Sequence, residues 1–208
     1  MGSTAELAFA LTISSLRNVI HSHQGALQGE WDYSKYIGRQ LNSLSIGVVG
    51  YGRLGKFYSS YFEPFESKVR VFDPYKNISA FEQTTDLESL ISLSDVLSLH
   101  VHVTDETIDL INSKSLLAAK EDILIINTSR GEIINEEDMV VFLESNSKAR
   151  LATDVLRDEI RDRKNSPLLE YAKTSDQVVI TQHIGGMTKE AQEIAYRKAA
   201  TLLNEFLS

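Results

Sequence analysis

The sequence predicts an α/β fold in which helices cover both faces of a doubly wound parallel β-sheet, giving three layers. From Ser45 onward, short apolar runs alternate with segments of helical periodicity. This alternation is typical of parallel strands joined by right-handed crossover helices. The apolar runs, such as Ile123–Ile126, have no polar face, as expected of strands that are covered on both sides.

The elements are expected in the following order. Residues 4–23 have apolar side chains at helical spacing, which predicts one long helix. The stretch from Gly25 to Gly38, with Trp31 as the only tryptophan, is expected to be a loop. The predicted strands are 44–49, 68–73, 95–101, 122–127, 149–154 and 177–181. The predicted helices are 53–62, 86–92, 113–119, 135–146 and 188–206.

Two helix starts and one irregular segment have their own signals. Asn135 is a predicted N-cap, because acids follow it in the first helical turn. Thr188 is expected to cap only partially, because a capping box would need an acid where Ala191 stands. Segment 156–176 is long, charged and irregular, which favours a functional loop.

The composition narrows the possible functions. The chain has 208 residues, 42% of them hydrophobic, which suits one large α/β domain or two small ones. Cysteine is absent, so a disulfide framework and a thiolate metal site are excluded, and no metal is expected. The net charge of −8, without a Lys/Arg cluster, argues against nucleic acid or a membrane as partner. The apolar stretch Leu7–Ile13 is interrupted by Thr12 and lacks a basic leader, so we expect a cytoplasmic protein.

A glycine-rich loop follows the first predicted strand. Gly50, Gly52 and Gly55 match the pattern G-x-G-x-x-G, and the next strand ends at Asp73. Such a loop permits a tight turn, close approach of a pyrophosphate to the backbone, and close helix–strand packing. The helix that follows would hold the phosphates with its free N–H groups. The alternative is that these are only turn glycines, but the strand–loop–helix–strand–acid order favours a dinucleotide-binding unit of the Rossmann type.

Three polar side chains follow later strands of the predicted sheet. Arg130, Glu159 and His183 come after the fourth, fifth and sixth strands. Carboxyl ends of parallel strands share one edge, which is where ligands bind in such sheets. Taken singly, the Arg could cap a loop and the Glu could be a solvated acid. Together they suit a reaction that moves a proton and a hydride on a small carboxylate.

These blocks resemble the NAD-binding domain of the D-isomer-specific 2-hydroxyacid dehydrogenases, which include phosphoglycerate dehydrogenases. The resemblance covers nearly the whole chain. It rests on Thr4–Glu6, Gly50–Gly55, Phe72–Pro74, His100–His102 with Thr107, Asn127–Gly131, Asp154–Val155 with Glu159, and His183–Gly186.

The resemblance implies a role for each catalytic candidate. His183 would be the general base for the substrate hydroxyl, Glu159 would orient its imidazole, and Arg130 would bind the substrate carboxylate or polarise the keto oxygen. Asp73 would accept hydrogen bonds from the adenosine ribose and so favour NAD over NADP. The implied NAD-binding residues are Gly50, Gly52, Arg53, Leu54, Gly55, Asp73, Pro74, Val101, His102, Thr107, Thr128, Ser129, Arg130, Asp154, His183, Gly185 and Gly186.

The chain departs from the family pattern at three positions. Ile160, Gln182 and His102 stand where proline is common in the family. These departures put the geometry of the loops in doubt more than their chemistry, and they are compatible with an unusual branch that has its own substrate.

The resemblance also sets expectations for the whole molecule. Residues 1–208 are expected to form a single cofactor domain, without the family's substrate-binding domain, and to be inactive without it. The expected reaction oxidises a D-2-hydroxyacid, with 3-phosphoglycerate as one candidate, to the 2-keto acid with NAD. A homodimer through the helix at residues 4–23 is expected. The alternative is a non-catalytic NAD sensor, like the corepressors of the same family.

Overall fold

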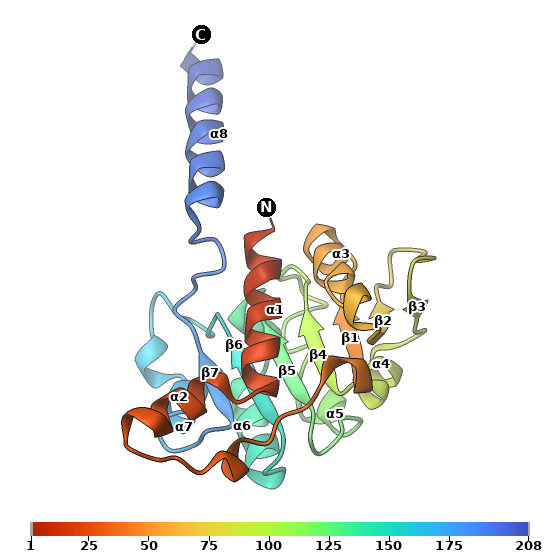
Figure 1. Cartoon of the computed structure of the whole chain (residues 1–208). Helices are drawn as coiled ribbons and strands as arrows, with labels where there is room; N and C mark the ends of the chain where they lie inside the picture. Colours follow the sequence, from red (N-terminus) through yellow and green to blue (C-terminus); the bar gives the residue numbers. More distant parts are fainter. Residues whose placement is uncertain (1, 208) are drawn as a thin grey trace.

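The computed structural model describes residues 2–207, and its centre is a seven-stranded parallel sheet (Figure 1). The strand order is β3-β2-β1-β4-β5-β6-β7, so the order reverses between β1 and β4. The strands are β1 Ser45–Val49, β2 Lys68–Phe72, β3 Glu82–Gln83, β4 Val96–Leu99, β5 Leu124–Asn127, β6 Arg150–Thr153 and β7 Val178–Ile180. This confirms the predicted doubly wound sheet, to which the structure adds the two-residue edge strand β3.

Helices cover both faces of the sheet, because successive strand residues point to opposite sides. On one face Val48 and Ile126 pack with α1 and α3, and on the other Val49 and Ile125 pack with α4, α5, α6 and α7. In Figure 1, α8 projects away from the sheet. The helices are α1 Ser3–Leu16, α2 Val19–Leu27, α3 Arg53–Ser60, α4 Leu87–Leu93, α5 Ser113–Leu116, α6 Glu136–Ser145, α7 Pro167–Tyr171 and α8 Lys189–Leu207.

The single long helix predicted for residues 4–23 is wrong, because the helix breaks between α1 and α2. Asn18 is buried and adopts a left-handed conformation with φ 53°. Its side chain donates to the carbonyl of Ile37 at 3.3 Å and accepts a hydrogen bond from the Arg150 guanidinium. Arg150 also donates to the carbonyl of Ser15 at 3.0 Å. Contacts with β6 and with the following segment therefore override the helical periodicity.

The segments predicted to be irregular contain short helices. The loop expected from Gly25 to Gly38 begins inside α2 and contains the 3₁₀ turn η1, Tyr33–Tyr36. Segment 156–176 contains α7, where Ser166 accepts a hydrogen bond from Leu169 N at 3.2 Å and Pro167 is the first helical residue. A serine followed by proline is a helix-start signal, so α7 could have been predicted.

The predicted caps are confirmed. Asn135 Oδ1 accepts a hydrogen bond from Asp138 N at 3.0 Å at the start of α6. Thr188 Oγ1 accepts one from Ala191 N at 3.1 Å before α8, without the reciprocal bond that an acid would give. Between residues 2 and 207, none of the helices combines the length and apolar character needed to cross a membrane.

Candidate functional site

The carboxyl ends of six neighbouring strands form one row in the register of the sheet. The last paired residues are Phe72, Val49, Leu99, Asn127, Thr153 and Ile180. The residues that directly follow them are Asp73, Gly50, His100, Thr128, Asp154 and Thr181. Most of these are predicted site residues, so the register of the sheet places them along a single edge.

The three glycines of the loop after β1 meet different surroundings. Gly50 has φ +88°, and a Cβ there would lie 2.5 Å from the carbonyl oxygen of His100 and 2.8 Å from Val101 Cγ1. A Cβ at Gly55 would lie 2.0 Å from the carbonyl oxygen of Gly50. Gly52, in contrast, has no atom within 4 Å of the Cβ position. Two glycines therefore allow the loop to form, and the third leaves open space beside it.

That open space lies at the start of α3. Arg53 and Leu54 begin this helix, and Gly52 precedes it with no side chain to cap it. The first N–H groups of an uncapped helix, at the positive end of its dipole, are a favourable place for a phosphate. This arrangement fits the pyrophosphate of a dinucleotide.

Asp73, the predicted ribose-binding residue, fixes the glycine loop. Its buried carboxylate accepts hydrogen bonds from Tyr51 N at 2.9 Å and from Tyr75 N at 3.0 Å, in the turn made by Pro74. Lys76 Nζ lies 3.6 Å from the same carboxylate and donates to the carbonyl of Tyr51 at 2.9 Å. Sequence reasoning missed Lys76, although a cation three positions after the acid was visible in the sequence.

The turns after β4 and β5 line the middle of the edge. Thr107 Oγ1 donates to the carbonyl of His102 at 2.6 Å, in an exposed loop. Ser129 Oγ donates to the carbonyl of Leu99 at 2.7 Å. Thr128 Oγ1 is buried and has no hydrogen-bond partner within the described chain. Because a buried hydroxyl without a partner is costly, Thr128 fits a site where a ligand supplies the missing bond.

Arg130 lies in a turn that is shaped by Asn127. The Asn127 side chain accepts a hydrogen bond from Ser129 N at 3.0 Å and donates to the carbonyl of Arg130 at 2.9 Å. The exposed guanidinium of Arg130 donates to the carbonyl of Ser129 at 2.6 Å. These bonds hold the Arg130 backbone and guanidinium near the end of β5. Among the described contacts, none links Arg130 with Glu159 or His183.

The structure brings Glu159 and His183 together. His183 Nδ1 is hydrogen-bonded to Glu159 Oε1, and Glu159 Oε2 accepts a hydrogen bond from Leu156 N at 3.3 Å. An ionised carboxylate can only accept, so we infer that Nδ1 carries a proton. The His183 side chain is 44% exposed, so the ring is accessible to a ligand.

Asp154 holds the backbone around His183. Its buried carboxylate accepts hydrogen bonds from Ile184 N and Gly185 N, each at 2.8 Å. Its carbonyl accepts one from His183 N at 2.8 Å. These bonds stabilise the left-handed conformation of His183, φ 56°. Gly186 has open space at its Cβ position.

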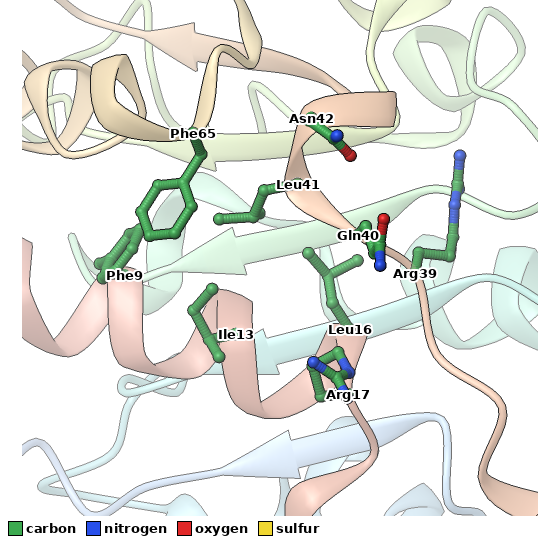
Figure 2. Close-up of a pocket in the computed structure, with 9 residues that line it drawn as sticks. All are labelled: Phe9, Ile13, Leu16, Arg17, Arg39, Gln40, Leu41, Asn42 and Phe65. Atoms are coloured by element: carbon green, nitrogen blue, oxygen red, sulfur yellow. The ribbon is translucent and has the colours of Figure 1, made fainter.

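A cavity of about 630 Å³ adjoins the histidine–glutamate pair. Ile160 and Gln182, which replace prolines of the family pattern, both line it, together with Arg163. A separate groove of about 590 Å³ lies beside α1 and shares no residue with this edge (Figure 2). In residues 2–207, no group of His, Asp and Glu side chains is arranged to hold a metal ion.

His100 lies beneath the glycine loop and is kept neutral. Its Nε2 lies 2.9 Å from Ser98 Oγ, and its ring centroid lies 4.8 Å from that of Tyr58. Burial lowers the pKa of His100 from 6.5 to about 3. Between about pH 6.5 and pH 3, the unfolded chain therefore binds a proton at His100 that the folded chain does not. The contribution of His100 to the free energy of unfolding is complete above about pH 6.5 and is lost as the pH falls toward 3.

We therefore expect the free energy of unfolding to fall by about 2 kcal/mol between pH 7 and pH 5 on account of His100 alone. His100→Gln should reduce this pH dependence, whereas His102→Gln, at an exposed position, should leave it unchanged. Urea unfolding at both pH values measures the difference. An equal pH dependence in all three proteins would show that His100 is not the group responsible.

The fold and the site together define a nucleotide-binding α/β domain with a histidine–carboxylate pair at its ligand edge. Residues 9–185 match the family described as D-isomer specific 2-hydroxyacid dehydrogenase, NAD binding domain. The chain belongs to this family, as predicted, and the cofactor of the family is NAD.

Relatives and solved structures agree with this assignment. The D-3-phosphoglycerate dehydrogenase of Archaeoglobus fulgidus is 32% identical over 91% of this chain and 36% of its own length. The hydroxypyruvate reductase of Thermotoga maritima is 33% identical over 91% of this chain and 61% of its own. The D-lactate dehydrogenase of Aquifex aeolicus, solved with NAD and lactic acid, has a TM-score of 0.90 and 28% identity, covering 99% of this chain and 66% of its own. The chain thus spans between about a third and two thirds of the length of these proteins.

Proposed function

We propose that this chain is the NAD-binding part of an enzyme that transfers hydride between NAD and a D-2-hydroxyacid, giving the 2-keto acid. The observation that carries this proposal is the hydrogen bond between His183 Nδ1 and Glu159 Oε1 at the ligand edge of the sheet. Retention of this pair together with Arg130 favours the enzyme over a sensor of NAD, although the corepressors that the sequence resembles retain the same residues, so turnover is what distinguishes the two. The names of the relatives support small 2-hydroxyacids as substrates, with 3-phosphoglycerate as one candidate.

Each of the three candidate catalytic side chains has a separate role in this reaction. His183 takes the proton of the substrate hydroxyl at Nε2, and Glu159 stabilises the resulting imidazolium through Nδ1. Arg130 binds the substrate carboxylate with its planar set of donors. Bound NAD supplies the acceptor for the hydride that leaves C2 of the substrate. In the reverse direction His183 returns the proton to the keto oxygen.

The binding part of this proposal can be tested on the chain itself. We expect NAD to bind at least about tenfold more tightly than NADP, because the Asp73 carboxylate repels a 2′-phosphate. Lys76 is the nearby cation that offsets part of this repulsion. Calorimetric titration of both cofactors measures the ratio, with Asp73→Asn expected to reduce it. Tighter binding of NADP would overturn the role of Asp73.

Turnover is expected to need more than this chain. The relatives are longer than the matched region, and we propose that further parts of the substrate site lie outside residues 1–208. Met1 and Ser208 themselves lie outside the described residues. We expect the purified chain to bind NAD without producing NADH from a 2-hydroxyacid, and steady NADH production by the chain alone would contradict this.

A second copy of the chain is the proposed partner. The groove beside α1 is lined largely by apolar side chains, among them Phe9, Ile13 and Phe65 (Figure 2). Trp31 and Tyr33, in the segment after α2, are 89% and 88% exposed. Apolar surface of this kind is a common feature of protein interfaces.

We therefore expect a dimer mass in light scattering at micromolar concentration. Phe65→Ala should shift the protein toward the monomer, because it removes an aromatic side chain that lines the groove and is 44% exposed. Leu93→Ala, at the end of α4 on the other face of the sheet and 42% exposed, is the matched control. A monomer mass for the unmodified chain would contradict the proposal.

A further inference from the structure

Glu136, the first residue of α6, has a buried carboxylate that faces the segment carrying Glu159. Its side chain is almost fully enclosed, with the residue only 1% exposed. Oε1 accepts a hydrogen bond from Arg157 N at 2.8 Å, and Oε2 accepts one from Ser166 Oγ at 2.6 Å. Burying a carboxylate is unfavourable unless such bonds compensate for lost hydration. One carboxylate thus joins both ends of segment 157–166.

Further contacts fix the same two ends. Ser166 Oγ also accepts the N-capping bond from Leu169 N, so Glu136 is linked to the start of α7. At the other end, the Arg157 guanidinium pairs with Asp109 and donates to the carbonyl of Glu132 at 3.2 Å. A Cβ at Gly131 would lie 2.2 Å from Arg157 N. The turn that carries Arg130 therefore lies directly against the anchored end of the segment.

The residues between these ends are held mainly by hydrogen bonds within the segment, such as those from Arg161 N and Asp162 N to the Asp158 carbonyl at 2.9 and 2.8 Å. Asp158 and residues 160–165 are exposed, and Asp158 has an unfavourable φ of 51°. Among the described contacts of Glu159, the bond from Leu156 N at 3.3 Å is long, and the other partner is His183 itself. The position of the Glu159 carboxylate therefore depends on how firmly the two ends are held.

We propose that Glu136 is a positioning residue for the histidine–glutamate pair. By holding Arg157 N and Ser166 Oγ, it keeps Glu159 Oε1 against His183 Nδ1, and so fixes which ring nitrogen of His183 carries the proton. This inference rests on the proposed function, in which Nε2 must be free to accept the substrate proton. Buried groups that orient a catalytic imidazole are a general means of setting its tautomer.

The test is ¹⁵N NMR of the His183 ring in the purified chain at a pH where the ring is neutral. The unmodified chain should have the proton on Nδ1. Glu136→Ala should produce a mixture of tautomers and at least about tenfold faster hydrogen exchange of the Arg157 amide, because both bonds are lost. Glu136→Gln should behave like the parent, since its amide can still accept from Arg157 N and donate to Ser166. Glu137→Ala removes an exposed acid from the same helical turn and is the matched control.

Two further variants separate the possible failures. Ser166→Ala removes one of the two bonds together with the N-cap of α7, and it should give a partial shift. If Glu136→Ala does not fold, the absence of any shift in Ser166→Ala overturns the proposal. Glu159→Ala, which removes the acceptor of the Nδ1 hydrogen bond, gives the reference for a broken pair. If Glu159→Ala changes the ring but folded Glu136→Ala and Ser166→Ala do not, the role of Glu136 is overturned. If Glu159→Ala leaves the ring unchanged, the pair on which the proposed function rests is itself contradicted.

Discussion

In an enzyme that contains this chain together with the proposed further parts of the substrate site, His183→Asn is expected to lower kcat/KM for a 2-hydroxyacid by about 10³-fold, within the range typical of lost general acid–base catalysis. The substitution removes the nitrogen that takes the substrate proton. Asparagine tolerates the left-handed conformation found at this position, φ 56°, better than most residues. The backbone bond from residue 183 to Asp154 should therefore persist, and NAD affinity should change by less than about tenfold.

Steady-state kinetics together with an NAD titration separate these two effects. His23→Asn, at an exposed position in α2, is the control for a histidine outside the site. If His183→Asn keeps kcat/KM within about tenfold of the parent, another group must take the proton, and the role of the histidine–glutamate pair is refuted.

Gly55→Ala and Gly52→Ala are expected to fail in different ways, although they lie in one loop. At Gly55 the new Cβ would lie 2.0 Å from the carbonyl oxygen of Gly50, and backbone cannot move aside as a flexible side chain can. We expect the free energy of unfolding to fall by about 3 kcal/mol or more. At Gly52 no atom lies within 4 Å and φ is −71°, so stability should change by less than about 1 kcal/mol.

The effect of Gly52→Ala should instead appear in cofactor binding. Its Cβ would occupy the space beside the start of α3, where we place the pyrophosphate. NAD affinity should fall by at least about tenfold, or about 1.4 kcal/mol. Urea unfolding and NAD titration of both variants measure the contrast. Unchanged NAD affinity in Gly52→Ala would place the pyrophosphate elsewhere.

The fold could be predicted from the sequence because the relevant signals are local. Strands covered on both faces are continuous apolar runs, and the glycine loop marks the point where the order of the sheet reverses. The helix break at Asn18 could not be predicted, because it depends on contacts with Arg150 and Ile37, which are distant in the sequence. α7 is different, since Ser166 followed by Pro167 is a local signal for the start of a helix.

The site also contains residues that the sequence predicts and one residue that only the structure shows. Glu159 and His183 were placed by motifs, and their pairing follows from the parallel order of β6 and β7. Glu136 could not be singled out, because as one of several acids after Asn135 it had the ordinary interpretation of a charge near a helix start. Only the packed structure shows that its neighbour Glu137 faces solvent while Glu136 is buried.

The central claim is hydride transfer from C2 of a D-2-hydroxyacid to NAD at this edge of the sheet. Its most direct test is to incubate an enzyme that contains this chain and the proposed further parts of the substrate site with NAD and 2-hydroxyacids deuterated at C2, with 3-phosphoglycerate included, and to measure deuterium in NADH by mass spectrometry. We predict that deuterium appears in NADH from a D-isomer and not from the corresponding L-isomer. Tight binding of NAD without deuterium transfer from any of these acids would contradict the account and favour a sensor of NAD.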